Sequence, residues 1–344
     1  MEDLEQLVFD GNTITNTSNY GFDFRAIYIN DLRNYYEITN NRVSGANTGT
    51  TNYAAYINDS DGSLATPALI ANNFFSSGGT GNGSRTVYMV SSSYVNFYHN
   101  NINSIATNTS SIGYYHNSNP NSNYKNNNVV HNGGGYAIYV SGTSIGSSDY
   151  NNIYTTGANL GYASGNRATL ADWQTVTSLE ANSISIDPIY TDSADLHVTA
   201  IGLDKAGTPV AEVTTDIDGE TRNPGTPDIG ADEFSNAQDD AGIFAITDPA
   251  TPFAEGATPV LVTIVNNGIN ALTSAEIQWT LNGIAQTPFN WTGNIASGAS
   301  LGAVNIGNFT AIANTGYDII VWTNQPNGNA DTENLNDTAQ VFDL

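Results

Sequence analysis

The chain has 344 residues, with eight Lys and Arg against 33 Asp and Glu, so its formal net charge is -25 at pH 7. So negative a surface repels phosphate backbones, which argues against nucleic acid as a partner. The chain has no cysteine, so disulfide bonds and thiolate metal sites are excluded. No apolar run reaches the length of about eighteen residues that a membrane-spanning helix needs, and we expect no membrane span.

A repeat runs through the first half of the chain. Six asparagines mark it, separated by 29, 32, 27, 27 and 24 residues: Asn12, Asn41, Asn73, Asn100, Asn127 and Asn151. In the last three copies a tyrosine lies twelve positions before the asparagine. This spacing is the length of one turn of a parallel β-helix, in which each turn lays its strands on those of the turn before. The sequence therefore predicts about six coils whose strands stack about 4.8 Å apart.

Alternation within the repeat predicts which side chains face inward. In the Ile-Tyr-Ile stretch at 27–29, a period of two places the isoleucines on one face and the tyrosine on the other. We expect an aliphatic coil interior, except in the fifth coil, where the same register places Tyr114 and His116 inside. The repeated asparagines are expected to adopt left-handed turn conformations and to hydrogen-bond to their copies in neighbouring coils.

The outward tyrosines are the first candidate site. In this register five of them lie one above another on a single sheet: Tyr28, Tyr56, Tyr88, Tyr115 and Tyr139. A row of flat rings about 4.8 Å apart is a candidate platform for the sugar rings of a glycan. The alternative is that stacked rings only stabilise the sheet, each pair contributing less than about 1 kcal/mol.

The coils are followed by a different kind of sequence. Thr169 with Asp172 three positions later predicts a capping box at the start of a short helix near 169–176. Four motifs then follow in order, at 182–188, 195–198, 216–222 and 227–234. This series resembles the closing segment of right-handed parallel β-helix proteins of the pectate-lyase-like superfamily, of the kind secreted through the type IX system. The resemblance implies that residues 1–234 form such a β-helix, with 182–234 as its closing segment, in a secreted or bacterial cell-surface protein.

The last third of the chain has the pattern of a second domain. Residues 235–242 are expected to form a linker in which Asp239 and Asp240 are solvated charges. Alternating stretches at 259–265, 275–281 and 317–322, with Asn282-Gly283 as a hairpin turn, predict strands. Without cysteine, this pattern favours an Ig-like β-sandwich over 243–344, so the fold class is all-β. It resembles the adhesion-related sandwich modules near the C-termini of type IX cargo proteins. The acidic N-terminus, the uncovered first coil and the missing sorting domain suggest a piece of a longer secreted chain.

Candidate catalytic carboxylates are scarce in the coils. There is no Asp or Glu between Asp61 and Asp149, so these coils lack the carboxylate pair of a glycoside hydrolase. Only the early coils remain open to such a site, through five acids: Asp23, Asp31, Glu37, Asp59 and Asp61. Arg85, Lys125 and Arg167 have no acids nearby in sequence that could hold calcium beside a lyase base. We therefore predict no catalytic residue.

Two acidic stretches are candidate calcium sites. Asp216 and Asp218 resemble part of a calcium loop but lack its third acid and distal glutamate, and the alternative is a structural turn. Asp331, Glu333 and Asp337 form a similar stretch, for which the alternative is an acidic hairpin loop. No other cofactor is expected.

Two further sets of residues are candidates for modification or metal binding. Ser193 and Thr338, each in an Asp-Ser/Thr-Ala triplet, resemble the O-glycosylation motif of the same bacteria. His99, His116 and His131 each precede an asparagine but stand at different places in the repeat. We therefore interpret them as solvated or hydrogen-bonded turn histidines rather than as metal ligands.

Taken together, the sequence favours a non-catalytic secreted or cell-surface adhesin or stalk that binds or displays glycans. Its expected partners are an extracellular polysaccharide or a cell surface, and the rest of a longer chain or the secretion machinery. One alternative is a polysaccharide lyase or glycoside hydrolase of the β-helix class. A second alternative is the structural subunit of a fibre.

Overall fold

The structure is a computed structural model that describes residues 6–16, 24–45, 51–80, 83–142, 145–234, 237–313, 315–331 and 336–344. It is mostly β and divides into two compact units, residues 1–234 and 235–344. Within the described parts of the chain, no helix has the length and apolar character needed to cross a membrane.

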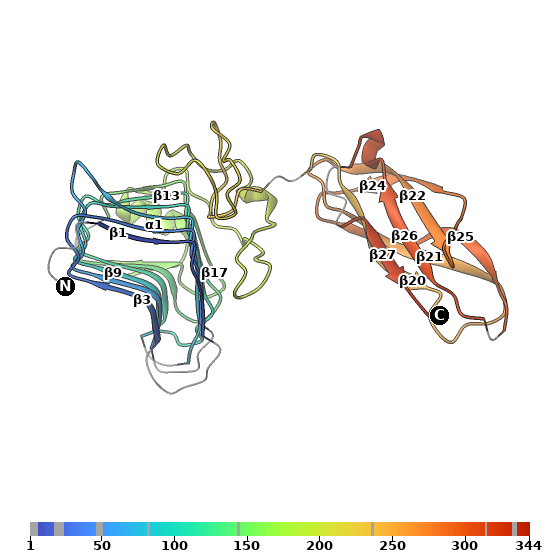
Figure 1. The fold of residues 1–344 in the computed structure, drawn as a ribbon, viewed down its shortest axis with the longest axis horizontal. Helices are drawn as coiled ribbons and strands as arrows, with labels where there is room; N and C mark the ends of the chain where they lie inside the picture. Colours follow the sequence, from blue (N-terminus) through green and yellow to red (C-terminus); the bar gives the residue numbers. More distant parts are fainter. Residues whose placement is uncertain are drawn as a thin grey trace. The chain divides into compact units, whose positions relative to one another are not determined.

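Three sheets form the walls of the first unit (Figure 1). The tyrosine sheet contains β3 (Phe24–Asn30), β6 (Asn52–Asn58), β9 (Arg85–Val90), β12 (Ile112–Asn117), β15 (Tyr136–Ser141), β18 (Gly161–Ala163) and β19 (Asn166–Arg167). The second sheet contains β2 (Thr13–Asn16), β5 (Arg42–Gly45), β8 (Phe74–Ser77), β11 (Asn101–Ser104), β14 (Asn128–His131) and β17 (Asn152–Thr155). The third contains β1 (Gln6–Asp10), β4 (Tyr35–Thr39), β7 (Ala68–Ala71), β10 (Val95–Tyr98), β13 (Asn123–Lys125) and β16 (Ser147–Asp149). Apart from β18 with β19, neighbouring strands are parallel, which confirms the predicted parallel β-helix.

The interior of the coils follows the predicted alternation. Ile27 and Ile29 are buried while Tyr28 between them is exposed, because successive side chains of a strand point to opposite faces. In the fifth coil Tyr114 and His116 are buried and Tyr115 faces outward, so the register does not slip there.

The six repeat asparagines form a continuous ladder along the coils. The side-chain amide of each donates to the side-chain oxygen of the next, at 2.9 to 3.1 Å. Each oxygen also accepts the backbone N–H of the preceding asparagine in the ladder, at 2.9 to 3.1 Å. The predicted contacts between copies are therefore confirmed, and the ladder spans five complete turns.

The predicted backbone conformation of these asparagines is wrong by one residue. The left-handed conformation belongs to the residue just before each ladder asparagine, with φ between 51° and 58° at Asn40, Asn72, His99, Asn126 and Tyr150. That residue turns the corner, and the ladder asparagine after it leads into the next strand of the second sheet.

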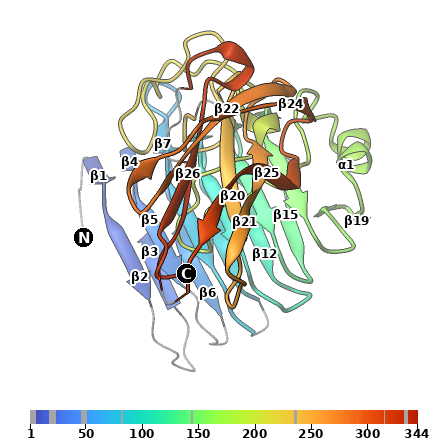
Figure 2. The ribbon, with the colours of Figure 1, turned by 90° about the vertical axis from the view of Figure 1, so that its right-hand side faces the viewer.

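The last coil is closed by a short helix and a buried carboxylate. The helix α1 (Leu170–Thr177) begins with the predicted capping box of Thr169 and Asp172, and it lies beside the last coils (Figure 2). Its Trp173 is fully buried in the coil core. The ladder ends at Glu180, whose carboxylate accepts hydrogen bonds from Asn151, Ser148 and Ser183. Burial nevertheless raises the pKa of Glu180.

The closing segment, residues 182–234, lies along the second sheet and its corner with the third (Figure 1). It contains the short helix η1 (Ile201–Leu203) and is held mainly by side chains of the coils that bond to its backbone. Asn101 provides an example, since its amide donates to Leu196 O at 2.7 Å and its oxygen accepts from Ala231 N at 3.1 Å.

The second unit contains two antiparallel sheets, as predicted for a sandwich-like domain. One contains β20 (Ala241–Asp248), β21 (Gly256–Asn266) and β25 (Ser300–Ala311). The other contains β22 (Leu272–Leu281), β23 (Ile284–Ala285), β24 (Phe289–Ile295), β26 (Ile319–Asn324) and β27 (Thr338–Val341), and η2 (Pro326–Gly328) follows β26. Side chains from both sheets share one core that includes Val262 and Trp279. Asn282 and Gly283 form the predicted hairpin turn, both with positive φ.

Candidate functional site

The tyrosine sheet presents one unbroken column of aromatic side chains. The five predicted tyrosines are paired in register on adjacent strands, and Tyr162 of β18 extends the column to six. Successive ring centroids lie 5.0, 4.7, 5.0, 5.4 and 4.4 Å apart, and the planes of stacked neighbours differ by 6° to 23°. The stacking follows from the coil period, which brings each ring to the van der Waals distance of its copy in the next coil.

The stacking changes what the column can offer to a ligand. Neighbouring rings cover one another's faces, so a sugar ring cannot lie flat on an inner tyrosine. The inner tyrosines instead present ring edges and phenol hydroxyls. These groups provide hydrogen bonds and apolar contact in a row that repeats from coil to coil. The glycan-binding role of the column stays a prediction.

Two arginines lie against the column. The guanidinium of Arg25 is 4.7 Å from the ring centroid of Tyr56, and that of Arg85 is 4.8 Å from the ring of Tyr115. In the part of the chain that the structure covers, neither guanidinium has a carboxylate within the 4.0 Å of an ion pair. The aromatic rings therefore orient both cations and leave them available to an anionic ligand.

The charge of the tyrosine sheet is opposite to that of the whole chain. Its seven strands contain no Asp, Glu or Lys, and their only charged residues are Arg25, Arg85 and Arg167. These are three of only eight basic residues in a chain of net charge -25. The tyrosines were predicted from the sequence, whereas Arg25 was not. The sequence signal that could have revealed it is an arginine three residues before the outward tyrosine in two strands, Arg25 in β3 and Arg85 in β9.

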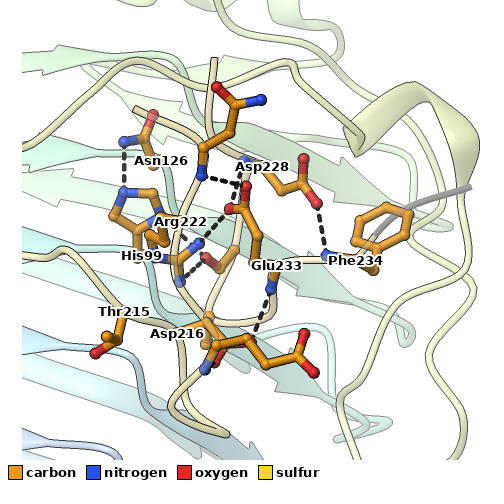
Figure 3. Close-up of polar contacts among 12 residues, drawn as sticks. His99, Asn126, Thr215, Asp216, Arg222, Asp228, Glu233 and Phe234 are labelled. Carbon is orange, nitrogen blue, oxygen red and sulfur yellow. Dashed lines mark hydrogen bonds and ion pairs between the residues drawn. The ribbon is translucent and has the colours of Figure 1, made fainter. Parts of the chain in front are cut away.

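The closing segment contains a buried network around Arg222 (Figure 3). Arg222 is 4% exposed, and its guanidinium is 3.1 Å from the carboxylate of Glu233. It also donates to Asn72 Oδ1 at 2.9 Å and to Gly230 O at 3.0 Å, which ties the segment to the third coil. The backbone N–H of Asp228 donates to Glu233 at 3.0 Å. Burial raises the pKa of the Asp228 carboxyl itself to about 7.

The first predicted calcium stretch does not form one cation site. Asp216 is buried, and its carboxylate accepts the backbone N–H groups of Asp218, Glu220 and Glu233 at 2.7 to 3.1 Å. It is thus the acceptor of a structural turn, which was the alternative interpretation. Asp218 points elsewhere, to Arg42 at 2.5 Å.

His197 lies between two carboxylates at the edge of the second sheet. Its Nε2 donates to Asp218 at 2.6 Å and its Nδ1 pairs with Asp195, while Asp232 is close enough to complete a possible metal-binding group. Arg42 of β5 already pairs with Asp218, so this cluster is an ion-pair clasp between the coils and the closing segment. Partial burial disfavours the charged imidazole, but the hydrogen bonds to Asp218 and Asp195 raise the pKa of His197 above its usual value.

The clasp predicts a pH dependence. Because the folded-state pKa of His197 is raised, its contribution is fully present below about pH 6.5 and is lost as pH rises through the folded pKa. We expect a loss of no more than about 1 kcal/mol, since both partners are partly exposed. Asp228 and Asp232, with raised pKa values of about 7 and about 6, change stability in the same direction.

A matched comparison isolates the histidine. Urea unfolding from pH 5.5 to 9 is expected to show a shallower fall in stability for His197→Gln than for the unmodified chain. Equal slopes for the two proteins would contradict the clasp.

The second unit brings three carboxylates together. They belong to Asp240, Asp331 and Asp337, and one oxygen of each lies within 4.8 Å of the other two. Asp240 is 3% exposed and Asp337 is 5% exposed. Burial, with Asp331 and Asp240 adding repulsion, raises the pKa of Asp337 to about 7. The structure thus joins two of the predicted residues, while Glu333 lies outside the residues that it describes.

Asp240 was missed because it was placed in a linker. The prediction that Asp239 and Asp240 are solvated charges is wrong for Asp240, which is buried directly before β20. Asp239 is also engaged, since its carboxylate accepts from Asn327 at 2.5 Å and from Asn329 at 2.6 Å. The burial of Asp240 follows from a strand that begins at Ala241.

The remaining predicted residues have the following positions. Ser193 and Thr338 are both exposed, so their hydroxyls are accessible to modification. His99, His116 and His131 are all fully buried and hydrogen-bonded, so the expectation of solvated histidines is wrong and that of hydrogen-bonded ones is confirmed. Only His99 lies at a turn, since His116 is in β12 and His131 is in β14, so the predicted turn position is wrong for those two.

Comparisons with known proteins add little. No protein-family model matches the chain, and no curated protein matches it. Among solved structures it is similar to the CARDB domain of the PF1109 protein from Pyrococcus furiosus, whose crystal structure is a complex with di-metal ions. The two are 17% identical over 32% of this chain and 91% of that one, with a TM-score of 0.26. So weak a likeness carries no argument. By its fold the protein is a parallel β-solenoid followed by an antiparallel, sandwich-like β domain.

Proposed function

We propose that the protein is a non-catalytic stalk, an adhesin-like protein whose tyrosine sheet binds an extended glycan. The observation that supports this proposal is the continuous column of six tyrosines with Arg25 and Arg85 beside it. A linear polymer suits a surface that repeats from coil to coil, because successive sugar units meet the same side chains. Tyrosine provides contact area and hydrogen bonds at a low cost in conformational entropy.

The charge of the tyrosine sheet favours an acidic polysaccharide. Arg25 and Arg85 are held in place by the rings and have no carboxylate partner among the described residues. A ligand that carries uronate or sulfate groups gains charge-assisted hydrogen bonds from them. It would be repelled by most other surfaces of so acidic a chain, which directs it to this sheet.

The test combines removal of the hydroxyls with removal of the charges. Tyr88, Tyr115 and Tyr139 are replaced together by Phe, which keeps the stacked rings, and Arg25 and Arg85 are replaced together by Gln. We expect each set to weaken the binding of an acidic polysaccharide in affinity electrophoresis by about tenfold or more. This estimate assumes that each replaced side chain loses roughly one hydrogen bond to the ligand. The arginine set should also reduce the dependence of binding on salt.

The control is Tyr154→Phe, a change of a half-buried tyrosine on β17 of the second sheet. It should leave retention unchanged, and far-UV circular dichroism should show that all variants are folded. Equal retention by the control and both variant sets would remove the tyrosine sheet as the binding surface.

A lyase or hydrolase is the second candidate function, and its carboxylates would have to come from the early coils. There Arg33 pairs with Asp31 at 2.9 Å, with Asp59 at 3.0 Å and with Asp61. Glu37 accepts a hydrogen bond from a tyrosine, and Asp23 lies outside the described residues. We place this function second because the three aspartates are engaged in ion pairs with Arg33, and Glu37 in a hydrogen bond with Tyr35. Incubation with acidic polysaccharides, followed by detection of unsaturated products or reducing ends, distinguishes the two.

We also propose a secreted or cell-surface location. The support is the resemblance of residues 182–234 to the closing segment of pectate-lyase-like proteins, and of the second unit to Ig-like adhesion modules of type IX cargo. The rest of a longer chain or the secretion machinery would then be a partner. Fractionation of the source cells tests the location. The fibre alternative predicts filaments whose amount increases with protein concentration.

A further inference from the structure

The buried carboxylates of the second unit lie where three segments meet. Asp240 comes directly before β20, and its backbone oxygen accepts from Asn267 and Gly268 at 3.1 and 3.2 Å. Asp337 comes directly before β27, and its backbone oxygen accepts from Ile243 N at 3.2 Å. Both positions are therefore fixed by backbone bonds at the edge of the two sheets. The backbone of the fold therefore holds these two carboxylates close to that of Asp331.

The second unit has no cation of its own to balance these charges. Residues 235–344 contain ten Asp and Glu and no Lys, Arg or His. Two of the converging carboxylates are more than nine-tenths buried, and like charges at this distance oppose folding. Asp240 accepts a hydrogen bond from Asn336 at 3.0 Å and Asp331 one from Ala241 N at 3.3 Å, but these neutral donors carry no charge. The charge repulsion itself is relieved by a bound proton or by a cation from solution.

One oxygen in the cluster points to a missing ligand. Oδ1 of Asp337 is buried and has no hydrogen-bond partner among the residues that the structure describes. Two other carboxylates of the described residues, that of buried Asp216 and that of half-buried Glu233, are fully satisfied. Asp216 accepts three backbone N–H groups, and Glu233 accepts two in addition to its pair with Arg222. A buried acceptor without a donor is costly, so Asp337 is better explained as a ligand than as a structural carboxylate.

The chemistry of the ligands selects the ion. We propose that Asp240, Asp331 and Asp337 form a calcium site that joins the start of β20 to the segment before β27. The three side chains offer only carboxylate oxygens, which suit hard divalent cations and exclude ions that prefer nitrogen or sulfur. Calcium is chosen over magnesium because it tolerates irregular geometry and accepts carboxylates from separate segments, with water completing its shell.

The experiment uses the full chain after treatment with a chelator. Three of its four tryptophans, Trp279, Trp291 and Trp322, are in the second unit, so fluorescence on heating mainly follows that unit. We expect millimolar calcium to raise its melting temperature by about 10 °C, as binding to the folded state alone would do. Isothermal titration should show calcium binding to the unmodified chain, and the variants below should repeat their thermal response in it.

The variant is Asp337→Asn, which keeps the shape of the side chain and removes one ligand charge. Without calcium it should be at least as stable as the unmodified chain, because repulsion is relieved, yet it should lose the response to calcium. The matched control is Asp343→Asn, an exposed acid of the same unit, which should keep the full response. A full response in Asp337→Asn, or none in the unmodified chain, would overturn the site. A response to magnesium with none to calcium would overturn the choice of ion.

Discussion

Replacing Asn100 by Ala is expected to lower the free energy of unfolding of the coils by about 3–5 kcal/mol. Asn100 is fully buried, and its amide donates to Ile70 O, Tyr98 O and Asn127 Oδ1 at 3.0 to 3.1 Å. Its oxygen accepts both the backbone and the side-chain N–H of Asn73 at 3.1 and 2.9 Å. Alanine leaves these groups buried without partners, and each orphaned group costs about 1–3 kcal/mol.

Urea unfolding followed by far-UV circular dichroism measures this loss. The control is Asn30→Ala, since Asn30 also accepts a bond from the next coil, from Asn58 at 2.8 Å, but is exposed. Water replaces that bond, so its loss should stay within about 0.5 kcal/mol. A loss for Asn100→Ala no larger than that of the control would show that the ladder is not what holds the coils together.

The ladder also shows why the coils could be predicted from the sequence. Each turn repeats the same local contacts, so the spacing of the asparagines and the alternation around Tyr88 and Tyr115 were enough to set the register. The left-handed corner was assigned one residue too late, because both residues of an Asn-Asn pair are of the same type and residue type alone does not favour one over the other. His99 and Tyr150, which occupy the same corner, show that the position is set by the coil and not by the residue.

The polar clusters could not be predicted in the same way. Arg222 meets Asn72 across 150 residues, and Arg42 meets Asp218 across 176. Such pairs depend on where the closing segment docks, which no local pattern encodes. Two of the three calcium candidates could be predicted because Asp331 and Asp337 are close in sequence. Asp240 joins them only because β20 lies against Asp337, whose backbone oxygen accepts from Ile243 N.

Replacing Arg222 by Met is expected to lower the free energy of unfolding by about 3 kcal/mol, because it leaves the Glu233 carboxylate, whose side chain is only 13% exposed, without its charged partner. The loss should be concentrated in the closing segment, which Arg222 ties to the coils through Asn72. Hydrogen exchange measured by mass spectrometry should show faster exchange over residues 182–234, with the ladder strands still protected.

A second change separates the orphaned charge from the lost packing. Glu233→Gln in the Arg222→Met background removes the unpaired charge and keeps the acceptor for Asn223 N, but its amide group no longer accepts from Asp228 N, so it should recover part of the stability. The control is Arg33→Met. Arg33 contacts three aspartates, more than Arg222 does, but its side chain is 51% exposed, so its loss should stay below about 1 kcal/mol. Burial, and not the number of ion pairs, is thus predicted to set the cost. Equal losses for the two arginine variants would refute that prediction.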